Sequence, residues 1–165
     1  METAVAKAEM LIRKPVEKVF DAFVNPEITT RFWFTRSSAL LEEGKTVRWD
    51  WELFGVSAQV LVCSVEQNRR IVIEWPGQGT ANTVEWLFTG REGGHTVVSI
   101  RETGFDLAAG NVIEQVADSS AGFSLVLAGA KAYLEHGLEL NLVADRFPDR
   151  APCQTAAANA IHWAT

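Results

Sequence analysis

The sequence has few of the residues that build metal centres and disulfide frameworks. It contains two cysteines and three histidines, and they lie far apart along the chain. Short, regular spacings of such residues are typical of zinc and other metal sites, and none is present. Cys63 falls in an expected strand and Cys153 near the C-terminal end, which favours one buried and one exposed thiol over a disulfide. We expect no metal and no other cofactor.

Long apolar runs and an excess of basic residues are also lacking. No run approaches the ~20 apolar residues that a membrane helix needs, and residues 1–9 alternate polar and apolar types instead of forming a signal peptide. The net charge of −6 repels phosphate backbones, and no cluster of lysine and arginine reverses it locally. These absences argue against membrane insertion and nucleic-acid binding, and they favour a cytoplasmic location.

What the chain does contain suits one hydrophobic core. Its 165 residues are 47% hydrophobic and 22% charged, which is the composition of an ordinary globular domain. Because no internal repeat or low-complexity linker interrupts it, we expect one domain over residues 1–147. Residues 148–165 form a tail, whose alanines with Ile161 and Trp163 are consistent with a short docked helix.

The first fifty residues predict a strand followed by two short helices. Residues 3–13 have the pattern of a strand, and Pro15 then suits the first turn of a helix because its ring fixes φ and it has no N–H. Apolar residues continue at helical spacing through residues 16–24. Asn25 is placed to cap a second helix that begins at Pro26 and ends near residue 31.

From residue 46 the hydrophobic period changes to two, which predicts strands over residues 46–53, 58–66, 71–75, 83–90 and 95–103. If residues 54–55 form a two-residue turn, the first pair has Leu53 opposite Val56, Trp51 opposite Ala58, Trp49 opposite Val60 and Val47 opposite Val62. A three-residue turn at residues 92–94 places Phe88 opposite Val98, Trp86 opposite Ile100 and Val84 opposite Glu102. Glu102 then shares the apolar face of the sheet.

A long helix is expected after residue 110. Asn111 and Glu114 have the spacing of a capping box, and helical periodicity continues to about Val143. The small residues 119–122 favour a kink and leave space beneath the helix. The apolar stripe of this helix contains Val112, Val116, Phe123, Leu127, Ala130, Leu134 and Leu138.

The order of these elements resembles the helix-grip fold of the START and polyketide-cyclase-like (SRPBCC) superfamily. The motifs Asn25-Pro26-Glu27, Phe32-Trp33, Ile71-Val72-Ile73-Glu74-Trp75, Val84-Glu85-Trp86, Glu102-Thr103-Gly104-Phe105 and Tyr133-Leu134-Glu135 are similar to those of one bacterial family. Its members resemble the C-terminal domain of the activator of the 90-kDa heat-shock-protein ATPase. The resemblance implies an α+β fold in which a curved antiparallel sheet of six or seven strands wraps around a long C-terminal helix.

The candidate site is the set of large side chains assigned to the concave face and to the helix above it. These are Trp33, Trp49, Trp51, Trp75, Trp86, Ile100, Glu102, Phe123 and Leu127. They either fill the core or line a ligand cavity, as aromatic walls do in many apolar sites. The small residues 119–122 favour the cavity, because they leave the space under the helix incompletely filled.

Glu102 is the most informative polar residue in this set. An ionised carboxylate on an apolar face is costly unless it is paired, and Arg48, Arg101 or a tryptophan N–H are the candidate partners. Alternatively, Glu102 lies at the open end of its strand and is hydrated. If it is buried, it would orient a ligand through a hydrogen bond, or act as a general base in an enzyme.

Three functions therefore remain open. The first is binding of a small apolar or aromatic molecule between the sheet and the helix, and the superfamily resemblance agrees with it. The second is a protein-interaction module, cochaperone-like or a homodimer, without a ligand. The third is a cofactor-independent cyclase or hydrolase with Glu102 as base, although no nucleophile, base and oxyanion donor can be assembled from the sequence.

Overall fold

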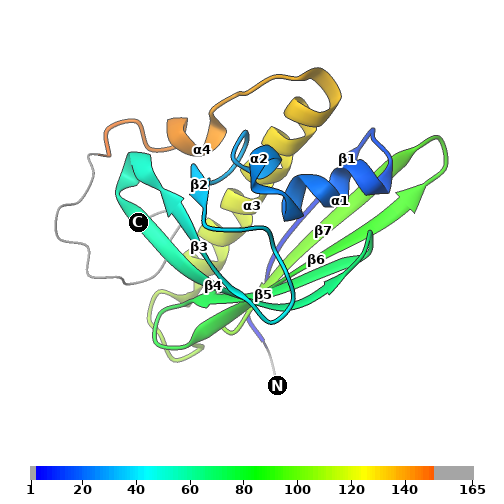
Figure 1. Cartoon of the computed structure of the whole chain (residues 1–165). Helices are drawn as coiled ribbons and strands as arrows, with labels where there is room; N and C mark the ends of the chain where they lie inside the picture. The colour runs from blue at the N-terminus through cyan, green and yellow to red at the C-terminus, as the bar shows by residue number, and fades with distance from the viewer. Residues whose placement is uncertain (1–2, 151–165) are drawn as a thin grey trace.

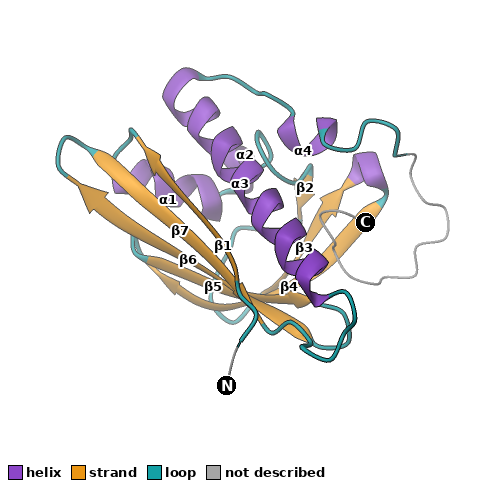
Figure 2. Cartoon of the chain, turned by 180° about the vertical axis from the view of Figure 1, so that it is seen from behind, coloured by secondary structure: helices purple, strands orange, loops and turns teal. Residues whose placement is uncertain are grey.

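The computed structural model describes residues 3–150 and consists of one curved antiparallel sheet with a long helix across it (Figure 1). The strands are β1 Ala6–Ile12, β2 Arg36–Ser37, β3 Thr46–Trp51, β4 Val56–Glu66, β5 Arg70–Pro76, β6 Ala81–Arg91 and β7 His95–Thr103, and the helices are α1 Val16–Val24, α2 Pro26–Thr29, α3 Val112–His136 and α4 Leu142–Asp145, with a 3-10 turn at Glu52–Phe54. The strand order is β1-β7-β6-β5-β4-β3-β2. Figure 2 shows α3 crossing the sheet. The expected helix-grip architecture is confirmed.

The pairing of β6 with β7 follows the predicted register. Phe88 lies opposite Val98, Trp86 opposite Ile100 and Val84 opposite Glu102. The three-residue turn between the strands contains Gly93 and Gly94, both with positive φ, which residues other than glycine rarely adopt. The alternate residues that face inward are buried, namely Asn82, Val84, Trp86 and Phe88 of β6 and Thr96, Val98, Ile100 and Glu102 of β7.

The predicted register of β3 with β4 is wrong by two residues. Trp51 pairs with Val56, Trp49 with Ala58 and Val47 with Val60, because the connection is a 3-10 turn that ends at Gly55 with φ 63°. A shift of two residues keeps the same side chains on the inner face. Leu53 leaves the strand and is 54% exposed.

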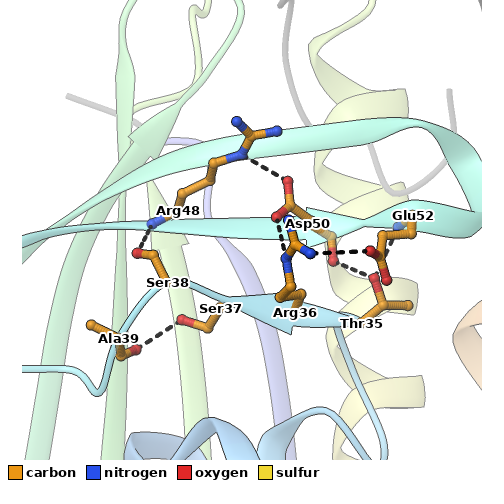
Figure 3. A network of polar contacts seen from close by, with 8 residues as sticks. All are labelled: Thr35, Arg36, Ser37, Ser38, Ala39, Arg48, Asp50 and Glu52. Atoms are coloured by element: carbon orange, nitrogen blue, oxygen red, sulfur yellow. Dashed lines mark hydrogen bonds and ion pairs between the residues drawn. The ribbon is translucent and has the colours of Figure 1, made fainter.

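The far edge of the sheet is held by a short strand that the sequence analysis did not predict. β2 pairs with β3, and the Asp50 carboxylate accepts a hydrogen bond of 2.8 Å from Arg48 Nε and lies 3.6 Å from Arg36 Nε (Figure 3). Thr35 donates from both its N–H and its hydroxyl to the Asp50 carbonyl, each at 2.8 Å. Asp50 is nearly buried, but its charge is compensated by two arginines.

Helix α2 begins as expected, since the Asn25 side chain accepts a hydrogen bond of 3.1 Å from the N–H of Glu27. The start of α3 differs from the expected capping box. The Asn111 side chain makes no capping bond, and its Oδ1 accepts instead from Gln115 Nε2 at 2.7 Å.

Helix α3 ends at His136 rather than near Val143. Gly137 adopts φ 68° and its N–H donates to the Tyr133 carbonyl at 2.8 Å, a left-handed cap that stops the helix. The predicted stripe is therefore too long, and Leu138 is exposed. The helix runs without a break through residues 119–122.

Cys63 corrects another expectation, because its thiol is exposed on the outer face of β4 rather than buried. Partial desolvation and the charge of Glu74 still raise the pKa of the Cys63 thiol. The tail prediction for residues 151–165, which includes Cys153, Ile161 and Trp163, lies outside the described residues.

An ion pair within the C-terminal half of α3 is hydrogen-bonded to the chain at the end of β1. Lys131 Nζ lies 2.6 Å from Glu135 Oε2 and donates to the Leu11 carbonyl at 2.8 Å. The same Glu135 oxygen accepts from the N–H of Arg13 at 3.3 Å. Burial alone raises the pKa of Glu135, but the hydrogen bonds from Lys131 and Arg13 and the charges of Lys131 and His136 together lower it.

We expect Glu135→Gln to lower the free energy of unfolding by about 1 kcal/mol at pH 7, since the pair is partly screened by solvent. A lowered folded-state pKa means that the carboxylate stabilises the fold above its unfolded pKa, about 4.3. The difference between variant and wild type should shrink below about pH 4 and vanish once folded Glu135 is protonated. Urea unfolding across pH 3–7 measures this. Glu139→Gln, which breaks an exposed pair with Arg31, is the control.

Candidate functional site

Large aromatic side chains meet on the inner face of the sheet under α3. Trp49, Trp51, Trp75 and Trp86 project from β3, β5 and β6, and all four are buried, as expected. Trp33 reaches them from the segment after α2, and Phe123 reaches them from α3. Ile100 of β7 and Leu127 of α3 are completely buried in the same core. The structure therefore brings together all nine residues of the candidate site.

Ring contacts hold this cluster together. Phe34 stacks on Trp49 with centroids 4.5 Å apart, and Trp33 lies 4.9 Å from Trp49. Phe123 is parallel to Trp75, at 5.8 Å and 18°. No molecule fits between rings as close as Phe34 and Trp49. The β3 end of the cluster is therefore packed core.

Glu102 is buried at the end of this face, with 2% of its surface exposed. Its Oε1 accepts two hydrogen bonds of 2.9 Å, one from Trp75 Nε1 and one from Asn82 Nδ2. The tryptophan partner was expected and the arginines are not partners, because Arg48 binds Asp50 and Arg101 is exposed on the other face. The hydrated alternative is wrong.

The second oxygen of Glu102 has a different environment. Within residues 3–150, Oε2 is buried and has no hydrogen-bond partner, and no ion pair there involves Glu102. We call this atom the open oxygen. Asp50 is buried to a similar degree, yet arginines compensate it (Figure 3). Buried polar atoms are almost always paired, so an exception calls for an explanation.

Two indole nitrogens repeat the pattern. Among the described residues, Trp49 Nε1 and Trp86 Nε1 are buried and have no acceptor. We call them the open N–H groups. The inner face therefore combines one acceptor and two donors that the described part of the chain leaves without partners, in aromatic surroundings.

Asn82 is a site residue that the sequence analysis missed. It is buried, and the turn between β5 and β6 fixes its position. Gly77 donates to the Thr80 carbonyl at 2.9 Å, and a Cβ at Gly77 would collide with that carbonyl and with Asn82 Oδ1. The sequence could have indicated this, because side chains alternate along a strand and residue 82 precedes the inward residues 84 and 86 by two and four positions.

Helix α3 adds further polar groups to its buried face. Gln115 and Ser119 are buried, and Gln115 Nε2 donates to Gln78 Oε1 at 3.0 Å. Farther along the helix, Gly129 allows a close approach, since a Cβ there would lie 3.1 Å from Phe32 Cβ. The helix face toward the sheet is thus polar near its N-terminus and apolar from Phe123 onward.

A pocket of about 530 Å³ opens beside the turn between β5 and β6. It is lined by Thr46, Gln59, Leu61, Glu74, Trp75, Pro76, Gly77, Gly79, Thr80 and Ala81. Trp75 is the one residue of the candidate site in this lining, and it joins the pocket to Glu102 through its hydrogen bond.

Clusters of metal-binding side chains and membrane-spanning helices are both absent from residues 3–150. No group of three or more histidine, cysteine, aspartate or glutamate side chains gathers there to hold a metal ion. No helix of residues 3–150 is long and apolar enough to cross a membrane.

Comparisons with known proteins place the chain in a family. The family model for "Activator of Hsp90 ATPase homolog 1-like protein" matches residues 13–135. No curated protein matches with significance. Among solved structures, the chain is similar to the protein SSP2350 from Staphylococcus saprophyticus, with 32% identity over 82% of this chain and 95% of that one, at a TM-score of 0.72.

Two more distant structures share the fold. The Aha1 dimer from Colwellia psychrerythraea is 14% identical over 81% of this chain and 97% of that one, with a TM-score of 0.68. CalU16 from Micromonospora echinospora is 17% identical over 86% and 88%, with a TM-score of 0.63. With the family match over most of its length and the helix-grip fold, the chain belongs to the Activator of Hsp90 ATPase homolog 1-like family of the START-like (SRPBCC) superfamily.

Proposed function

We propose that this protein binds a small, mainly aromatic molecule between the inner face of the sheet and α3, with Glu102 as its polar anchor. The observation that carries the proposal is the open oxygen of Glu102, which is buried without an ion pair in the described part of the chain. Burying such an atom costs about 1–3 kcal/mol. A ligand that supplies the missing partner would recover that cost.

The surroundings of Glu102 support an apolar ligand. The Trp75 and Phe123 rings lie nearly parallel, with centroids 5.8 Å apart, and Trp75 brings this aromatic surface to Glu102 through its hydrogen bond. Ile100 and Leu127 add aliphatic surface. Pockets for small molecules typically combine such apolar walls with a few well-placed polar groups. Trp33, Trp49, Trp51 and Trp86 back these walls and hold them in place.

Tryptophan fluorescence tests this proposal, because the candidate walls are themselves the fluorophores. Titration with flat aromatic and fatty compounds should shift or quench the emission in a saturable way. Leu127→Phe, which enlarges a completely buried side chain, should weaken binding several-fold, whereas Leu87→Phe at a partly exposed position should not. An unchanged spectrum across a broad library, together with no co-purified molecule in native mass spectrometry, would contradict the proposal.

The site supports binding more directly than catalysis. The hydrogen-bond partners of Glu102 are a tryptophan and an asparagine, and neither side chain exchanges protons readily enough to complete an acid–base pair. A cyclase or hydrolase with Glu102 as base therefore lacks its second group among the described contacts.

A homodimer is a second candidate, and one comparison favours it. The structurally similar protein from Colwellia psychrerythraea was solved as a dimer. Sedimentation equilibrium of the full chain, and of a chain without residues 151–165, would detect such an assembly and show whether the tail contributes. A monomeric mass for the full chain at 100 µM would exclude it at that concentration.

A further inference from the structure

We propose that the ligand carries a hydrogen-bond donor, an O–H or N–H group on a mainly aromatic skeleton, and that this donor binds the open oxygen of Glu102. The inference rests on the proposed function and narrows it. It restricts the expected ligands from apolar molecules in general to those with a hydrogen-bond donor. It also names the protein atom that would recognise this donor.

The polarity of the missing partner follows from the two oxygens of Glu102. Oε1 already accepts from Trp75 and Asn82, so the described contacts fix the carboxylate in one orientation and leave only Oε2 for a ligand. In the ionised carboxylate, each oxygen is an acceptor only. A ligand that offers only acceptors, such as an ether or a ketone, would place two acceptors together and would be rejected.

The backbone around Glu102 does not supply this donor. Glu102 lies in β7 between two paired strands, opposite Ala6 of β1 and Val84 of β6. The N–H groups of these antiparallel ladders are directed along the sheet, between the strands, whereas the Glu102 side chain projects from its inner face. A partner for the open oxygen must therefore approach from the side of the sheet that faces α3.

Two kinds of donor meet this requirement. An ammonium group would also compensate the charge of Glu102, and the protein's net charge of −6 attracts cations. A hydroxyl group donates and accepts at once, so it would also suit the open N–H group of Trp86. Both present the same chemistry to the open oxygen, and a matched set of compounds separates them.

Four naphthalenes test the inference on the full-length protein. Naphthalene has no polar group, 2-methoxynaphthalene has an acceptor only, 2-naphthol has a hydroxyl, and 2-(aminomethyl)naphthalene has an ammonium. Proton–nitrogen correlation spectra report binding through the indole N–H signals, of which that of Trp75 is hydrogen-bonded to Glu102. At least one donor compound should bind about tenfold or more tightly than naphthalene and 2-methoxynaphthalene.

Glu102→Gln is the decisive variant. Because Oε1 accepts two bonds, the glutamine oxygen should take that place and its NH₂ group should take the place of the open oxygen. An acceptor then becomes a donor at nearly constant shape. The preference for donor compounds should disappear, and 2-methoxynaphthalene should gain relative to naphthalene. Asp50→Asn, which neutralises a nearly buried carboxylate outside the site, should leave the wild-type order unchanged.

The outcomes separate the two proposals. If none of the four compounds binds the wild-type protein, the proposed function fails together with this inference. If all four bind equally, or if the donor preference survives in Glu102→Gln, a ligand site exists but the donor requirement is overturned. Should the glutamine variant fail to fold, the wild-type order of the four compounds still decides, since it requires no substitution.

Discussion

Phe123→Ala is expected to lower the free energy of unfolding by about 3–5 kcal/mol. Its ring is completely buried and is the contact of α3 with three tryptophans, at centroid distances of 6.2 Å to Trp33, 5.8 Å to Trp75 and 6.3 Å to Trp86. Truncation removes this apolar surface and opens a cavity between rigid rings that cannot collapse into it. Chemical denaturation followed by far-ultraviolet circular dichroism measures the change.

A control on the same helix separates this effect from helix propensity. Ile113 is 82% exposed in the first turn of α3, so Ile113→Ala should change stability by no more than about 0.5 kcal/mol. If Phe123→Ala cost no more than this control, the rings under α3 would not form the packed core described above. The size of the difference therefore measures how firmly the helix is held on the sheet.

The sequence predicted the β6–β7 half of the sheet better than the β3–β4 half, and turn chemistry explains why. The turn between β6 and β7 contains Gly93 and Gly94, which favour a three-residue turn. The register of the two strands follows from the length of that turn. Between β3 and β4, a turn of two residues and one of four give the same alternation of apolar side chains. Periodicity cannot distinguish registers that differ by two, so the 3-10 turn was not predictable from it.

The end of α3 was predictable, whereas the packing of the rings was not. Gly137 stands in the sequence as an ordinary helix-stop signal, and the apolar residues beyond it obscured that signal. The inward direction of the strand tryptophans followed from the alternation of side chains along each strand. Which rings stack depends on side-chain rotamers and on the path of residues 31–35, so the contact of Phe34 with Trp49 emerged only from the structure.

The same limit applies to Glu102. The position of Glu102 on the inner face followed from the β6–β7 register. Because burying an unpaired carboxylate costs free energy, this position indicated that Glu102 has a partner. The sequence did not reveal that the partner bonds would all fall on Oε1, because this depends on the turn that presents Asn82 beside Trp75. The asymmetry between the two carboxylate oxygens is what makes Glu102 a candidate ligand contact rather than only a buried polar residue.

Glu102→Ala should lower the free energy of unfolding by about 2–6 kcal/mol, because it leaves Trp75 Nε1 and Asn82 Nδ2 without their acceptor and each buried unpaired donor costs about 1–3 kcal/mol. Asp50→Ala removes a carboxylate that is buried to a similar degree but should cost only about 1 kcal/mol. Its partners Arg36 and Arg48 are 69% and 55% exposed, so water replaces the lost interaction.

Unfolding in urea, with Glu102→Gln alongside, tests this contrast. The glutamine variant keeps an acceptor for both donors and should therefore recover most of the stability lost in the alanine variant. Equal costs for Glu102→Ala and Asp50→Ala would mean that water reaches Trp75 and Asn82 as freely as it reaches the arginines at the sheet edge. In that case the inner face near Glu102 would be hydrated, and a buried anchor for an aromatic ligand would be contradicted by stability measurements alone.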